Sequence, residues 1–141
     1  MTGQDYTLLI PEIFLFAWAL FIIIFESLNR KNSPKLLGYL TMLGLAVTGI
    51  LLTCYNGGNL FYGMFQSDQL SVFFKVIFLG AAFMAVGSSF NIASEKIRNH
   101  CGEYFGLILL STVGMMFLAS ASELLSIYVG MELTTIPLYV L

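Results

Sequence analysis

Residues 8–28 of the chain read LLIPEIFLFAWALFIIIFESL. The only charged side chains in this run are Glu12, near its start, and Glu26, near its end. A helix needs roughly 20 predominantly apolar residues to cross the hydrocarbon core of a bilayer. The run is too long for a barrel strand and shows no alternation of period two, so it predicts a transmembrane helix.

Apolar runs of similar length recur at residues 36–55, 70–90, 104–121 and 124–141, and polar or helix-breaking residues separate them. The expected fold is an all-α polytopic bundle of about five transmembrane helices, forming a single membrane domain over residues 1–141. The last two spans are so close in sequence that they should form an antiparallel hairpin. The chain stops without a polar flank, so we expect truncation in or just after the fifth span, as in a piece of a longer protein.

The composition of the chain also indicates a membrane protein. Of its 141 residues 58% are hydrophobic and 10% are charged, and the mean hydropathy is +0.88. A soluble domain carries about 25% charged residues, so the lipid bilayer is the expected surroundings. A net charge of −2 without a basic patch argues against a nucleic-acid partner. The two cysteines show no CxxC or Cys/His clustering and no Gly-rich nucleotide loop is present, so we expect no metal, iron–sulfur or nucleotide site in this chain.

The basic residues predict the orientation. Five of the six Lys and Arg residues fall between spans one and two or between spans three and four. These five are Arg30, Lys31, Lys35, Lys96 and Arg98. By the positive-inside rule those connections are cytoplasmic, so the N-terminus is expected outside and the first span is retained. This topology separates Cys54, near the outer face, from Cys101, near the inner face, too far for a disulfide.

Two of the charges inside the spans have simple structural interpretations. Glu12 follows Pro11 at the outer start of span one, where a carboxylate meets the positive end of the helix dipole, and this capping role is favoured over a functional one. Glu26 precedes Arg30 by four residues, an ion pair in the favourable order.

Lys75 leaves two alternatives open. It lies in span three, seven residues after Asp68, so the two side chains share a helix face. Snorkelling, or pairing with Asp68, is favoured, and a place in a polar channel is the alternative. His100, in the connection that also holds Lys96 and Arg98, is interpreted as a solvated loop histidine.

Glu132 is the main candidate for chemistry. It lies eight residues beyond Leu124, near the middle of span five, where a side chain cannot reach water. Hydroxyl-bearing residues at offsets of −4, +3 and +7 extend the same stripe, which we expect to face the protein interior: Tyr128, Thr135 and Tyr139. Pro137 frees a backbone carbonyl one turn earlier. We therefore predict that Glu132 is a proton-handling group. The other residues of the stripe and Pro137 would form a supporting polar path, and Lys75 is a further candidate member of that path. A protonated Glu132 that only bonds neighbouring helices is the alternative.

The residues from 122 to 141, SELLSIYVGMELTTIPLYVL, closely resemble the fifth helix of the subunit N family of bacterial NADH–quinone oxidoreductases, or complex I. The acidic-Leu-Leu start, the Gly-x-Glu-Leu motif and the Pro-Leu-Tyr-x-Leu ending carry this resemblance. Pro11-Glu12 and the stretch from Asp68 through Phe73-Phe74-Lys75 extend it, so that it covers the whole chain.

The resemblance implies an antiporter-like, proton-translocating subunit in the membrane arm of a NADH:quinone oxidoreductase of the bacterial inner membrane. In that family the glutamate matching Glu132 acts as a proton switch and pairs with a lysine on a later helix. The implied partners are other antiporter-like and small membrane subunits. NADH, flavin, iron–sulfur clusters and quinone would be bound by partner subunits, and this piece alone would be inactive.

Two other classes remain open at the level of sequence. Subunits of cation/proton antiporters and of membrane-bound hydrogenases carry a similar glutamate on the homologous helix. A non-catalytic membrane anchor or assembly scaffold, in which Glu132 is only structural, is the second alternative. The sequence beyond Leu141 would separate these classes, because intramembrane lysines there would support proton transport.

Overall fold

The computed structural model describes residues 9–28, 34–54, 58–60, 65–95 and 100–141. Their secondary structure consists of five helices and two short strands. In chain order these are α1 (Ile10–Leu28), α2 (Pro34–Cys54), β1 (Gly58–Leu60), β2 (Phe65–Ser67), α3 (Gln69–Glu95), α4 (Cys101–Ser120) and α5 (Leu124–Val140).

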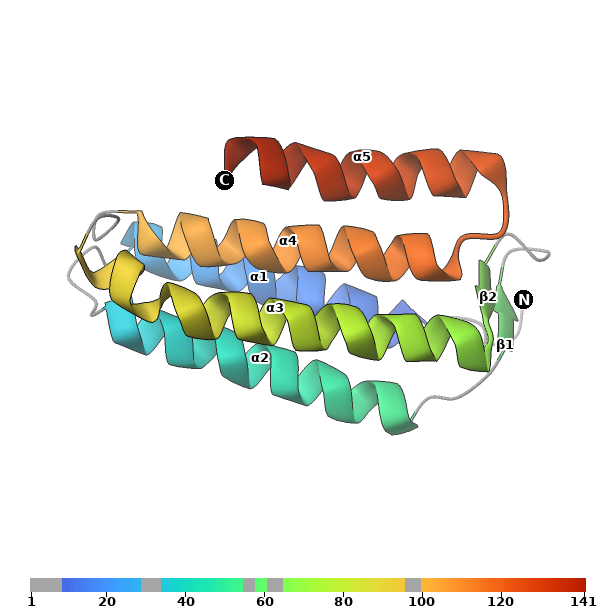
Figure 1. Ribbon diagram of the computed structural model, residues 1–141, viewed down its shortest axis with the longest axis horizontal. Helices are drawn as coiled ribbons and strands as arrows, with labels where there is room; N and C mark the ends of the chain where they lie inside the picture. The colour runs from blue at the N-terminus through green and yellow to red at the C-terminus, as the bar shows by residue number, and fades with distance from the viewer. Residues whose placement is uncertain (1–8, 29–33, 55–57, 61–64, 96–99) are drawn as a thin grey trace.

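The helices run up and down along a common direction, and α4 lies between α5 on one side and the other helices on the other (Figure 1). The helix α5 returns antiparallel along α4, as the short link between them predicts. The first four helices pack on one another, whereas α5 packs on α4. The predicted all-α helix bundle is thereby confirmed.

Four of the helices, α1 to α4, contain segments long and apolar enough to cross a membrane. The helix α5 is also apolar but has 17 residues. Each helix overlaps one predicted span, and most ends agree within two residues. The two larger differences are that α3 continues to Glu95 and that α4 begins at Cys101. Gly102 lies in the first turn of α4, where the backbone N–H groups have no intrahelical partner and a glycine costs little.

The connection between α2 and α3 contains structure that the sequence did not predict. Residues Gly58–Leu60 pair antiparallel with Phe65–Ser67 as a two-stranded hairpin. Strands of three residues are too short to show a period of two, so no pattern marks them. The hairpin lies at the end of the bundle where α1 and α3 begin (Figure 1), which we call the hairpin end.

The helix α1 turns one continuous stripe toward the bundle. Leu15, Ala19 and Ile22 are fully buried at its centre, and the buried carboxylates Glu12 and Glu26 lie at its two ends. Spacings of three and four residues keep all five on one helix face. Since the apolar part of the stripe gives a carboxylate no partner, each acid must be satisfied at its own end of the bundle.

Glycines of α4 set its distance from two neighbours. Gly106 lies against the side chain of Ile23 on α1, and Gly114 lies against the backbone of Thr134 on α5. On α5 itself, Gly130 lies against the backbone of Leu118. Small residues at such contacts let membrane helices approach closely.

The α4–α5 contact gives the first prediction. A Cβ atom at residue 114 would lie 2.6 Å from the backbone nitrogen of Thr134, so Gly114→Ala must push the two helices apart. We expect a loss of about 1–3 kcal/mol in the free energy of unfolding, the usual cost of overpacking. Thermal unfolding of the protein in detergent measures it.

Gly80→Ala on α3 is the matched control, because nothing lies within 4 Å of the added methyl group. Alanine is favoured over glycine in a helix by up to about 1 kcal/mol, so the control should be neutral or stabilising. Equal destabilisation by both substitutions would contradict the close contact between α4 and α5.

Candidate functional site

The stripe of α5 that carries Glu132 points away from the other helices. The buried residues of α5 are Gly130 and Pro137, seven residues apart on the face that contacts α4. Glu132 is two residues from Gly130, about 200° around the helix at about 100° per residue, and therefore lies on the opposite face. Glu132 and Thr135 are exposed, and Tyr128 and Tyr139 are 61% and 89% exposed. In the described residues this stripe faces away from the bundle, and its expected place in the protein interior stays a prediction.

The hydroxyl group of Thr135 bonds the backbone rather than the carboxylate of Glu132. Thr135 donates to the carbonyl oxygen of Met131 at 2.9 Å and lies 3.4 Å from that of Glu132. Its hydroxyl therefore bonds the backbone of its own helix. The four residues do share one face, as predicted, and that face is presented outward as a polar line on an apolar helix.

Lys75 has a different partner from the predicted one. Its Nζ lies 2.5 Å from Oε1 of Glu12, and the two side chains are 2% and 0% exposed. The predicted partner, Asp68, is exposed. The reason is geometric, because α1 and α3 both begin at the hairpin end. Glu12 lies about 3 Å from the start of α1 and Lys75 about 9 Å from the start of α3. The long lysine side chain spans this difference in depth.

Glu12 thus does more than the predicted capping of α1, although it does lie in the first turn of that helix. The sequence contained one usable signal for the pair. A carboxylate and a lysine were each one or two turns inside spans expected to start at the same membrane face. The predicted pairing of Lys75 considered only residues of its own helix and therefore did not include Glu12.

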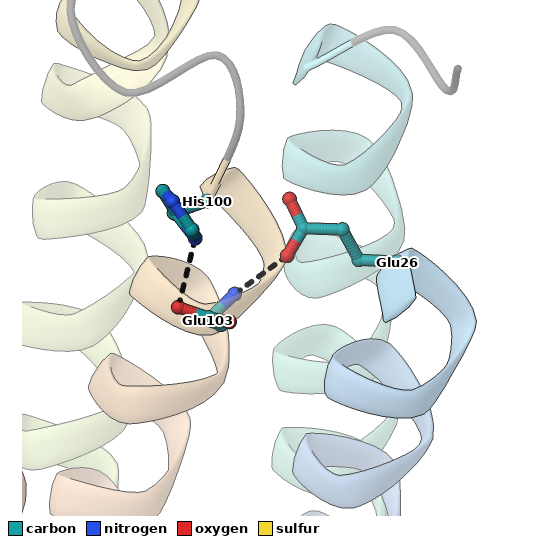
Figure 2. A network of polar contacts seen from close by, with 3 residues as sticks. All are labelled: Glu26, His100 and Glu103. Atoms are coloured by element: carbon teal, nitrogen blue, oxygen red, sulfur yellow. Dashed lines mark hydrogen bonds and ion pairs between the residues drawn. The ribbon is translucent and has the colours of Figure 1, made fainter. Parts of the chain in front are cut away.

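Glu26 lies at the opposite end of α1 and bonds the start of α4. Its Oε2 accepts a hydrogen bond from the backbone N–H of Glu103 at 3.0 Å, as Figure 2 shows. This N–H is one of the first in α4, where a carboxylate replaces the missing intrahelical acceptor and meets the positive end of the helix dipole. The predicted partner of Glu26, Arg30, lies outside the described residues.

His100 precedes α4 and is exposed, as predicted, but it has a partner. Its Nδ1 lies 3.1 Å from Oε2 of Glu103, three residues later (Figure 2). Both side chains are more than 60% exposed, so the contribution of this pair to stability is small. The contact joins the residue before α4 to the first turn of that helix.

Within the part of the chain that the structure describes, no group of three or more His, Cys, Asp or Glu residues could hold a metal ion. An apolar cavity of about 240 Å³ lies between α3, α4 and the end of α5, where Ala85, Tyr104 and Leu138 contribute to its lining. Glu132 does not line it. In the part of the chain that the structure describes, the Glu132 face, the Glu12–Lys75 pair and the Glu26 contact therefore lie in three separate places.

No protein-family model matches the chain, but curated proteins are similar to it along nearly its whole length. It is 34% identical to NADH-quinone oxidoreductase subunit N 2 of Koribacter versatilis, over 97% of this chain and 30% of that protein. It is 35% identical to NADH-quinone oxidoreductase subunit N of Desulfitobacterium hafniense, over 100% of this chain and 29% of that protein. It is 33% identical to NADH-quinone oxidoreductase subunit N of Desulforamulus reducens, over 97% of this chain and 29% of that protein. The chain thus spans about 30% of the length of these relatives.

The contact of Glu26 with α4 gives the second prediction. Glu26→Ala leaves the partly buried N–H of Glu103 without its acceptor and should lower the free energy of unfolding by about 0.5–2 kcal/mol, as for the loss of other helix caps. Glu26→Gln keeps an oxygen at the same position and should cost less. Thermal unfolding midpoints measure both, and a glutamine variant as unstable as the alanine variant would contradict the capping role.

Proposed function

This chain is homologous to NADH-quinone oxidoreductase subunit N along nearly its whole length, and from this we propose that it is part of a proton-translocating membrane subunit of such an oxidoreductase. Together with its apolar helices, this homology identifies a multi-pass membrane protein. In the proposal, the longer protein moves protons while partner subunits pass electrons from NADH, through flavin and iron–sulfur clusters, to quinone. Other antiporter-like and small membrane subunits are its neighbours in the complex.

The observation that supports a role for Glu132 most directly is its place on α5. It lies eight residues into the helix, about 12 Å from the first residue, on the face opposite α4. A carboxylate in contact with hydrocarbon at such a depth is costly, and polar residues inside membranes usually face other protein segments or water. Because the relatives are much longer than this chain, we propose that other helices of the full-length protein cover this face.

Glu132 then works as a proton-exchanging group at that contact. The proton occupancy of a carboxyl group responds to a positive charge that approaches or withdraws. In the subunit N family, which this chain resembles, the positive charge is the ammonium of a lysine on a later helix. A proton on Glu132 leaves as the ammonium approaches and returns as it withdraws, so movement of charge is converted into proton transfer. The role of α5, held closely on α4 through Gly114 and Gly130, is to keep the carboxylate at a fixed depth.

The third prediction tests this role in the full-length protein within the assembled complex. Glu132→Gln keeps the size and hydrogen bonding of the side chain but cannot release a proton. We expect normal assembly and a fall in proton pumping of roughly tenfold or more, because a positioned proton-transfer group contributes on the order of 10²-fold or more. Glu132→Asp keeps the ionisable group and should be milder. The measurements are the amount of assembled complex, followed by protons moved per NADH oxidised.

Thr53→Val serves as a control, since this exposed residue near the end of α2 is far from Glu132 in the fold. Wild-type pumping by an assembled Glu132→Gln complex would refute the proton role and would support the scaffold alternative, in which Glu132 only bonds neighbouring helices.

We also propose that the hairpin end of the bundle is extracytoplasmic in the bacterial inner membrane, because the basic connections lie at the other end. The fourth prediction uses two exposed residues from the two ends, Asp68 and Lys35. In a Cys54→Ser background, a membrane-impermeant maleimide added to intact cells should label Asp68→Cys. It should label Lys35→Cys only after the membrane is permeabilised. The reverse pattern would invert the proposed orientation.

A further inference from the structure

The hairpin end of the bundle contains a group of buried polar side chains that the Glu132 mechanism does not use. Glu12, Lys75 and Ser120 are 0%, 2% and 2% exposed. Lys75 Nζ is the ion-pair partner of Glu12 Oε1. Oε2 of Glu12 and Oγ of Ser120 have no hydrogen-bond partner among the described residues. Two polar atoms without partners, both fully enclosed by protein, therefore accompany one ion pair.

The register of α1 against α4 places Glu12 and Ser120 within about one helical turn of each other along the bundle. The two helices are antiparallel, with Glu26 bonding Glu103 and Ile23 lying against Gly106. Continued along α1, this register brings Glu12 level with Phe117, three residues before Ser120. At about 1.5 Å per residue, Ser120 is displaced from Glu12 by about 5 Å along the helix axis.

Ser120 also lies on the correct side of α4. It follows Gly106 by close to four helical turns, so it shares the stripe with which Gly106 contacts α1. The other charged side chains described at this end, Asp68 at the start of α3 and Glu123 before α5, are exposed, and so is the thiol of Cys54 at the end of α2. The buried polar groups described at this end are therefore the carboxylate of Glu12, the ammonium of Lys75 and two hydroxyls, that of Ser120 and that of Ser71, one turn before Lys75 on α3.

Stability alone does not account for this arrangement. A buried ion pair is commonly no more stabilising than well-packed apolar side chains of the same volume. The unpartnered oxygen atoms add a further cost, of about 1–3 kcal/mol for each buried polar group left unsatisfied. Buried groups of this kind in proteins are usually satisfied by ordered water, and ionisable groups inside membrane proteins commonly mark proton or ion paths.

We propose that Glu12, Lys75 and Ser120 form a second proton-exchange site, which binds water at the hairpin end of the bundle. Water held between Oε2 of Glu12 and Oγ of Ser120 connects the carboxylate to the outside. A hydronium ion there gives its proton to Oε2: one O–H bond of the hydronium breaks, one O–H bond forms on Glu12, and water remains. The ammonium of Lys75 pairs with Oε1 of Glu12. It thereby positions the carboxylate and balances its negative charge. This inference rests on the proposed function, since the proton path is that of the same complex.

The test uses the full-length protein in the assembled complex and measures protons moved per NADH oxidised. The double variant Glu12→Gln/Lys75→Met removes the exchangeable proton and the ammonium together, so no unpaired buried charge is left. Ser120→Ala removes only the hydroxyl and leaves the ion pair in place. Asp68→Asn is the matched control, because it removes an exposed carboxylate at the same end.

We expect the double variant to assemble and to lose roughly tenfold or more of its proton transfer. Ser120→Ala should assemble normally with a smaller loss, and Asp68→Asn should match the wild type. Normal proton transfer by the assembled double variant would show that the pair is only structural and would overturn the proposal. If the double variant fails to assemble, Ser120→Ala decides, and wild-type transfer by that variant overturns the proposal.

The outcomes for the two sites are separable. Normal pumping by Glu132→Gln together with a loss in the double variant would refute the role of Glu132 and support the site at the hairpin end. A loss of pumping in Glu132→Gln, together with normal pumping by the double variant and by Ser120→Ala, would support the role of Glu132 and refute the site at the hairpin end.

Discussion

Hydrocarbon offers no hydrogen-bond partner, so a polar group that a membrane helix buries must be satisfied by another part of the protein. The arrangement of this chain follows that constraint. Glu12 has the ammonium of Lys75, and Glu26 has the N–H of Glu103 at the start of α4. Buried threonines use the nearest acceptor and donate to the carbonyl four residues earlier in their own helix: Thr41, Thr48 and Thr112. The polar contacts thereby fix which helix ends meet, while the apolar stripes between them allow many registers.

The helix α4 can lie at the centre because it presents small side chains on more than one side. Gly106 accommodates Ile23 of α1, and Gly114 accommodates the backbone of α5. By contrast, α5 buries only Gly130 and Pro137, so most of its surface is left for other contacts. This one-sided attachment explains how a carboxylate near the middle of an apolar helix is compatible with the fold. The first four helices leave Glu132 exposed, which is compatible with the proposal that other helices of the full-length protein cover it.

The length and composition of the apolar runs were sufficient to predict the helices and the antiparallel pairing of α4 with α5. They also separated Cys54 from Cys101, which lie at opposite ends of the bundle. The partners of the charged residues were not predictable in the same way, because periodicity describes one helix at a time. Lys75 was paired with Asp68 on its own helix, whereas its partner is on α1. Similarly, the pattern of α5 identified which residues share a face with Glu132 but carried no information about which neighbour that face meets.

The two carboxylates of α1 also affect how the protein is made. Synthesis from the N-terminus delivers α1 to the membrane before either partner exists, since Lys75 belongs to α3 and the N–H of Glu103 to α4. Until those helices enter, the ion pair and the hydrogen bond that satisfy the two acids are missing, so contact of these acids with the headgroup region is favoured. The newly inserted α1 is therefore free to shift along the membrane normal, held only by its apolar centre. Its depth is set at one end when the third helix arrives and at the other when the fourth does, so biogenesis of this unit is complete only with α4.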